Sequence, residues 1–166
     1  YTDNHHQGLP VTPGILYATL ALLVIGIGVA LHLIGIKLDI LAGGAGNAGC
    51  TASATIDCGT VNASKYSMVG PFPIALLAIP TYVLLGYLVF KALGALKTAT
   101  GAQRRQAALG LDVGMVIGLL TCVFSIYLFY VSKFVIKKLC PYCIALYVVN
   151  LGVTATLFWA GRRSIL

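Results

Sequence analysis

The sequence predicts an all-α membrane protein, a four-transmembrane-helix bundle with a Cys-bearing extracytoplasmic loop between helices 1 and 2. Two observations predict this class: the composition and four long charge-free windows. Of the 166 residues, 59% are hydrophobic and 9% are charged, and the mean hydropathy is +0.95. Soluble domains carry about 25% charged residues. The composition therefore excludes a soluble enzyme, a disordered tail and a nucleic-acid reader, although the net charge is +7.

The charge-free windows give the number of spans. Asp, Glu, Lys and Arg are absent from residues 14–36, 66–90, 113–132 and 139–161. A spanning helix needs about 20 mostly apolar residues, so each window is long enough to cross a bilayer. Within residues 1–166, read as a single integral membrane domain, we expect helices at about 15–36, 73–96, 109–131 and 140–160.

Two segments are predicted to connect these helices. Residues 40–56, ILAGGAGNAGCTASATI, also lack charge, but their glycines and small polar residues are typical of a loop. The segment 97–106, KTATGAQRRQ, is predicted to be a polar connection between the second and third helices.

The basic residues give a small positive-inside signal. Four spans place both termini and the second connection on one side, with six Lys or Arg against five on the other. This excess favours cytoplasmic termini. Two cysteine pairs would then lie on the extracytoplasmic side, where disulfides persist. We therefore expect a multi-pass protein of the cell inner (cytoplasmic) membrane with its active site on the periplasmic side.

The motif Cys-Pro-Tyr-Cys at 140–143 opens the fourth helix. A proline suits the first helical turn, and the helix N-terminus stabilises a thiolate and lowers the cysteine pKa. Lys137 and Lys138 should act in the same direction. These features favour a reactive thiol pair over an inert bridge.

A polar stripe follows the motif. Cys143, Tyr147 and Asn150 are spaced to share one helix face, where they would hydrogen-bond a carbonyl-bearing ligand. The alternative is that Tyr147 is an ordinary residue of the interfacial aromatic belt.

Cys50 and Cys58 lie in the Gly- and Ser/Thr-rich first loop, which would let a thiol pair move between two partners. A static loop staple and a four-cysteine structural zinc site are the alternatives. The seven-residue spacing is long for a zinc knuckle. Cys122 lies mid-helix and reads as a small hydrophobe, and no residue is assigned to a metal.

Two thiol pairs on one side of a membrane suggest an electron relay by thiol–disulfide exchange. An external dithiol would reduce Cys50–Cys58, and a loop thiolate would then attack Cys140–Cys143. The last pair needs an acceptor at the membrane surface, and a lipid-soluble quinone of the ubiquinone, menaquinone or vitamin K type suits that place.

Taken together, these features resemble the vitamin K epoxide reductase family in its bacterial form. The resemblance covers nearly the whole chain: four helices, Cys-x7-Cys in the first outer loop and Cys-x-x-Cys at the head of the fourth helix. Residues 61–82 resemble the family's segment from a serine, here Ser64, to a Gly-x-Pro start of the second helix. Gly70-Pro71-Phe72-Pro73 is an altered form of that start. Tyr147 matches a tyrosine that vertebrate members use near the quinone.

The resemblance implies roles for the cysteines. Cys143 would be the catalytic thiol nearest the quinone, Cys140 would exchange with Cys58, and Cys50 would face the protein partner. A thioredoxin-like (DsbA-like) protein of the extracytoplasmic space is the implied partner, as a separate chain or as a domain absent from this one. The implied activity is disulfide generation for extracytoplasmic protein folding.

The resemblance also implies a quinone-binding group, in which Ser64 and Tyr147 would help to hold the quinone beside Cys143. DsbB-type oxidases are an alternative of different fold, but their Cys-x-x-Cys lies in the first outer loop, the reverse of the order here. A thiol-based heavy-metal transporter or a purely structural bundle would each leave a basic-flanked Cys-x-x-Cys at a helix start unexplained.

Overall fold

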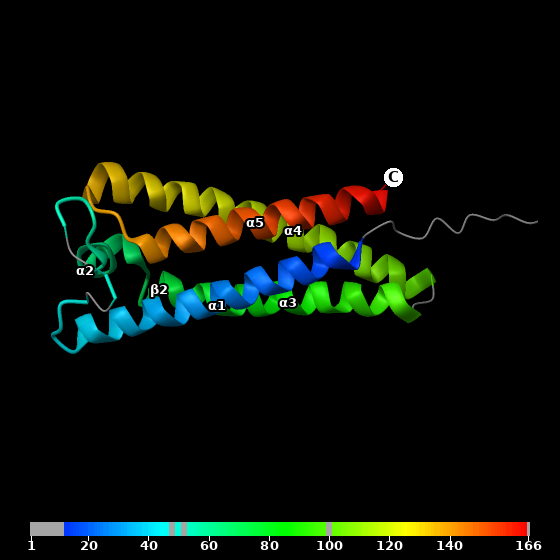
Figure 1. The fold of residues 1–166 in the computed structure, drawn as a ribbon, viewed down its shortest axis with the longest axis horizontal. Helices are drawn as coiled ribbons and strands as arrows, with labels where there is room; N and C mark the ends of the chain where they lie inside the picture. Colours follow the sequence, from blue (N-terminus) through cyan, green and yellow to red (C-terminus); the bar gives the residue numbers. More distant parts are fainter. Residues whose placement is uncertain (1–11, 47–48, 51–52, 99–100, 166) are drawn as a thin grey trace, which may run out of the picture.

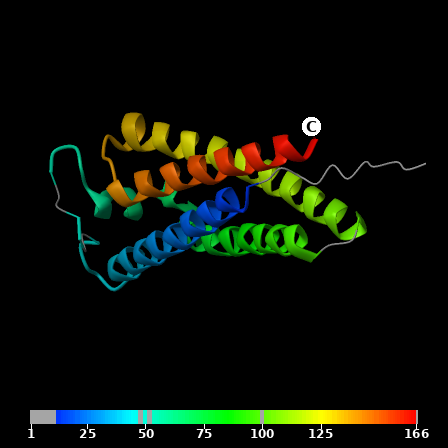
Figure 2. The ribbon, with the colours of Figure 1, turned by 45° about the vertical axis from the view of Figure 1, so that its right-hand side comes forward.

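The computed structural model describes residues 12–46, 49–50, 53–98 and 101–165. Four long helices run side by side in an elongated bundle (Figure 1, and turned by 45° in Figure 2). They are α1 (Pro13–Leu41), α3 (Ile74–Thr98), α4 (Gly101–Tyr130) and α5 (Pro141–Ile165). Each is long and apolar enough to cross a membrane. The predicted fold class, a four-transmembrane-helix bundle, is confirmed.

Shorter elements gather at one end of the bundle. They are α2 (Cys58–Ala63), the 3-10 turn η1 (Lys65–Ser67), strands β1 (Met68–Val69) and β2 (Phe72–Pro73), and the π-helical extension of α4, η2 (Val131–Ile136). The two strands form an antiparallel hairpin, with Met68 opposite Pro73 and Val69 opposite Phe72. Gly70 at the turn has φ +60, a conformation that glycine adopts more readily than residues with a side chain.

Helix boundaries differ from the prediction where polar residues continue a helix beyond the charge-free window. Residues 101–106 belong to α4, so the predicted connection 97–106 is wrong over that part, and the helix begins eight residues before position 109. Gln and Arg are good helix formers, so the helix extends past the apolar segment. Likewise α1 continues through Lys37 to Leu41 instead of ending at 36. The single-domain organisation over 1–166 stays a prediction.

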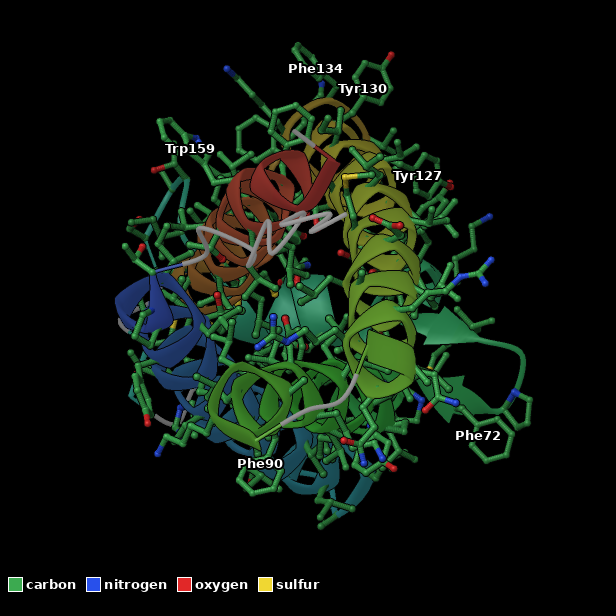
Figure 3. The ribbon with its side chains drawn as sticks, turned by 90° about the vertical axis from the view of Figure 1, so that its right-hand side faces the viewer. Phe72, Phe90, Tyr127, Tyr130, Phe134 and Trp159 are labelled. Atoms are coloured by element: carbon green, nitrogen blue, oxygen red, sulfur yellow. A yellow bond between two sulfur atoms is a disulfide. The ribbon has the colours of Figure 1, made fainter. Side chains whose placement is uncertain are left out.

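Close packing of the helices depends on glycine at particular contacts. A Cβ on Gly26 of α1 would lie 2.8 Å from the ring of Tyr82 on α3 and 3.0 Å from Val149 on α5. Burying apolar side chains between helices gains little in a membrane, because lipid is equally apolar. Membrane helices therefore associate through close packing, which small residues allow. Large apolar side chains accordingly cover the outside, and Figure 3 shows Phe90, Tyr127, Tyr130 and Trp159 pointing away from the bundle.

Gly26→Ala should therefore destabilise the bundle. The added methyl group forces Tyr82 or Val149 to move, and overpacking of this kind costs about 1–3 kcal/mol. Gly28→Ala, two residues along the same helix, is the matched control because its Cβ would meet nothing within 4 Å. Thermal unfolding in detergent measures both variants. An equal melting temperature for the two would contradict the packing argument.

Candidate functional site

Both cysteine pairs lie at the same end of the bundle. In Figure 1, α2 and the start of α5 occupy the left-hand end, and the C-terminal end of α5 lies at the right. Residues more than 80 positions apart in the sequence thus share one site. The two predicted cysteine pairs thus lie at one end of the bundle.

The loop pair is joined and buried. Cys50 and Cys58 form a disulfide, and their exposed fractions are 8% and 0%. Asp57 caps α2 by accepting hydrogen bonds from the backbone N–H of Thr60 (3.0 Å) and from its hydroxyl (2.8 Å). The backbone hydrogen bond from Thr60 is the main reason that the pKa of Asp57 is lowered, so the cap stays charged.

The second pair carries free thiols at the start of α5. Cys140 is 1% exposed and directly precedes the helix, and Cys143 lies in its first turn. A hydrogen bond from the Cys143 thiol lowers the pKa of Cys140 to about 7 against the opposing effect of burial. Backbone N–H groups of Cys143 and Tyr142 act in the same direction. The predicted effect of the helix start on the thiolate is therefore present.

Lys137 and Lys138, which flank the motif, are not what lowers the pKa of Cys140. Lys138 directs its ammonium group to the carbonyl oxygens of Ser53 (3.1 Å) and Ala54 (3.0 Å) in the first loop. Lys137 has a left-handed backbone, with φ 58, where η2 ends. Hydrogen bonds account for the lowered pKa of Cys140, and Lys138 instead fastens the loop to the segment before α5.

Backbone pairing brings the two cysteine pairs together. Ile56 and Leu139 form an isolated parallel bridge, in which the N–H of Asp57 donates to Leu139 O (3.0 Å). The N–H of Leu139 in turn donates to Thr55 O (2.8 Å). Cys58 and Cys140 each follow this paired segment, so they are held next to each other.

Asn62 links these cysteines directly. Its side-chain amide donates to Cys58 O (2.9 Å) and to the Sγ of Cys140 (3.8 Å). The backbone carbonyl oxygen of Asn62 accepts hydrogen bonds from the buried ammonium group of Lys37 (2.8 Å) and from the Ser67 hydroxyl (2.6 Å). The sequence reasoning missed Asn62 and counted Lys37 only as a helix flank. A lysine inside an apolar helix was the available signal.

Tyr142, inside the Cys-x-x-Cys motif, forms a second link to the loop. Its hydroxyl donates to Gly49 O (2.8 Å), beside Cys50, and its ring packs on His32 with centroids 4.4 Å apart. Gly49 has φ +70, and a Cβ there would lie 2.7 Å from the Tyr142 oxygen. Glycine is therefore required at this contact.

A cavity of about 340 Å³ lies among the helices beneath α2. Cys143, Tyr147 and Ser64 line it, together with Asn150, so the predicted polar stripe faces one space. Most other lining side chains are apolar, as in pockets for small organic molecules. Cys50, Cys58, Cys122 and Cys140 are not among its lining residues, so Cys143 is the one cysteine in its wall.

Three other residues singled out in the sequence are Tyr147 and Ser64, which line the cavity, and Cys122, which does not. The ring of Tyr147 packs edge-on against Phe129, with centroids 6.5 Å apart. Ser64 ends α2 and donates its hydroxyl to Val61 O (2.7 Å). Cys122 lies on α4 with its sulfur 3.2 Å from the Thr154 hydroxyl, and it does not line the cavity.

Asn62→Leu should raise the pKa of Cys140 from about 7, because the thiolate loses a hydrogen-bond donor. A smaller fraction of thiolate remains at pH 7, so alkylation of Cys140 should slow by roughly two- to threefold. Site-resolved mass spectrometry across a pH series measures this rate, with Cys122 in the same chain as an internal reference. An unchanged pH profile at Cys140 would show that Asn62 does not stabilise its thiolate.

Comparison with known proteins supports what this geometry suggests. A search of the curated proteins finds no match to the chain. The model of the vitamin K epoxide reductase family matches residues 17–158, which is most of the chain and includes all five cysteines. With its four membrane-compatible helices and its disulfide, the chain belongs to the vitamin K epoxide reductase family, a family of membrane thiol–disulfide oxidoreductases.

Proposed function

We propose that this protein is a membrane thiol:quinone oxidoreductase that generates disulfides for extracytoplasmic protein folding. Electrons from a thioredoxin-like partner enter at Cys50–Cys58, pass to Cys140–Cys143 and leave on a quinone in the bilayer. One observation carries this proposal: Cys143 lines an apolar cavity between the helices, and Cys140 lies beside the loop pair. In this proposal, Cys140 exchanges electrons with the loop pair, and Cys143 passes them to the quinone.

The transfer between the pairs balances as a disulfide exchange. A partner dithiol first reduces Cys50–Cys58 and itself becomes a disulfide. The Cys58 thiolate then attacks the Cys140 sulfur of the Cys140–Cys143 disulfide, and Cys143 leaves as a thiolate. Cys50 attacks Cys58 in turn, and Cys140 leaves. Because the pKa of Cys140 is about 7, it is a good leaving group in this last step.

The proposed exchange ends with Cys50–Cys58 oxidised and with Cys140 and Cys143 as thiols. Closing the Cys140–Cys143 disulfide then releases two electrons and two protons, which convert a quinone to a quinol. The proton balance is complete without a further reductant.

The cavity suits a quinone because the surface of its wall is mainly apolar and several hydroxyl and amide side chains supply hydrogen-bonding groups. Tyr147 and Ser64 would hold the quinone beside Cys143, and the surrounding helices would exclude water from the thiol. A ubiquinone, a menaquinone or a vitamin K quinone offers the same two carbonyl oxygens on an apolar ring.

The proposed orientation places the cysteine end on the extracytoplasmic side of the inner membrane and the termini in the cytoplasm. Two features support it. The disulfide at the cysteine end requires an oxidising compartment to persist. The opposite side has the larger number of Lys and Arg, six against five.

Cys143→Ser should abolish quinone reduction driven by a small dithiol, because the sulfur beside the cavity is lost. Cys50→Ser should mainly block electron transfer from the protein partner. Quinone absorbance in nanodiscs follows the first reaction, and oxidation of a thioredoxin-like protein follows the second. Cys122→Ser is the matched control and should retain both. Turnover of quinone by Cys143→Ser would overturn the assignment.

Tyr147→Phe should weaken quinone binding by about one hydrogen bond, on the order of 1 kcal/mol, which is about a fivefold rise in KM. Tyr130→Phe is the control, because Tyr130 is exposed on the outside of α4 and does not line the cavity. Steady-state kinetics over a range of quinone concentrations gives both values. A KM for Tyr147→Phe equal to that of the wild type removes Tyr147 from the binding site.

A further inference from the structure

Three polar side chains from three helices meet at the cavity wall. Tyr82 of α3 donates its hydroxyl hydrogen to Asn150 Oδ1 of α5 (2.7 Å). The Asn150 amide nitrogen donates to Ser125 Oγ of α4 (2.9 Å). All three residues line the cavity. This triad is therefore part of the wall of the cavity that Cys143 lines. The sequence placed Asn150 on the same helix face as Cys143, but the proposed quinone site above uses only Cys143, Ser64 and Tyr147.

The direction of these hydrogen bonds is fixed by the chain itself. The Ser125 hydroxyl donates its only hydrogen to Thr121 O (2.8 Å), so toward Asn150 it can only accept. The Asn150 amide must then turn its nitrogen to Ser125 and its oxygen to Tyr82. The Asn150 side chain cannot flip without losing both contacts.

This arrangement leaves unused hydrogen-bonding capacity in an apolar space. One amide hydrogen of Asn150 has no partner among the described residues, and the Tyr82 oxygen retains lone pairs. Tyr82 is 2% exposed, so its oxygen is shielded from bulk water, and Asn150 is half-buried beside it. A polar group within a membrane bundle is costly unless it is paired, so an unpaired donor on a residue that lines the cavity favours a ligand acceptor there.

We propose that Asn150 donates a hydrogen bond to the quinone carbonyl remote from Cys143, with Tyr82 and Ser125 as positioning residues. This inference rests on the proposed function and identifies a second anchor in the same cavity. Asn150 follows Cys143 by seven residues, about 10 Å along the helix axis, so a ring lying along α5 would reach both.

The test uses the full chain in nanodiscs with a short-chain 1,4-benzoquinone and dithiothreitol. Tyr82→Phe keeps the ring but releases the Asn150 amide, and Asn150→Leu removes the donor. Both should raise the KM and the Kd for the quinone about three- to tenfold, the change expected for one hydrogen bond. Thr19→Val is the matched control, because its buried hydroxyl joins α1 to Thr156 of α5 away from the cavity.

Two further readouts separate ligand binding from a structural role. In the Asn150→Leu background, Tyr82→Phe should add no further loss, because Tyr82 acts through Asn150. An analogue with a single ring oxygen should bind Asn150→Leu and wild type equally. If Asn150→Leu does not fold, Tyr82→Phe and Ser125→Ala decide the matter by the same measurements.

The failure of this inference is distinct from the failure of the proposed function. If wild type reduces the quinone and both Tyr82→Phe and Asn150→Leu retain its KM and Kd, the anchor is overturned and the function stands. If wild type neither binds nor reduces the quinone, both are overturned. Equal weakening by Thr19→Val would also overturn the anchor, because the loss would then reflect general destabilisation.

Discussion

The backbone pairing between residues 55–57 and Leu139 is the contact on which the rest of the site depends. It joins the first loop to the segment before α5, and so places Cys58 beside Cys140 although 82 positions separate them. Asn62 reinforces the contact by bonding to both cysteines, and the buried Lys37 holds Asn62 from below. Without this pairing, the two cysteine pairs would share an end of the bundle but would not be held next to each other, as the proposed disulfide exchange requires.

The start of α5 links the cysteine end of the bundle to the cavity between the helices. Cys140 lies outside the helix and faces the loop pair, and Cys143 lies one turn later and lines the cavity. The same helix then presents Tyr147 and Asn150 to that cavity, and α3 and α4 hold Asn150 in a fixed orientation. One helix therefore carries Cys143 and several polar residues of the cavity wall, so in the proposed function its position would affect both thiol exchange and quinone binding.

Patterns within short segments of the sequence predicted the features that depend on those segments alone. Charge-free windows located four helices, and the proline and cysteine spacing located the reactive helix start. The windows misplaced the start of α4, because a charge-free window marks only the part of a helix that lies in the apolar core of the membrane. The polar residues 101–106, GAQRRQ, extend the helix beyond that part. Lys37, Asn62 and Tyr82 were missed because their importance lies in contacts with distant segments. No spacing in the sequence reveals that Tyr82 on α3 meets Asn150 on α5.

The most direct test of the account is an anaerobic count of thiols against quinol in a single turnover of the reconstituted protein. The chain, with Cys50–Cys58 oxidised and Cys140 and Cys143 reduced, would be mixed with excess quinone and its remaining thiols alkylated and mapped by mass spectrometry. The account predicts that two thiols disappear for each quinol formed, that these are Cys140 and Cys143, and that Cys122 stays reduced. Quinol formation with both thiols still alkylatable, or no quinol at all, would contradict it.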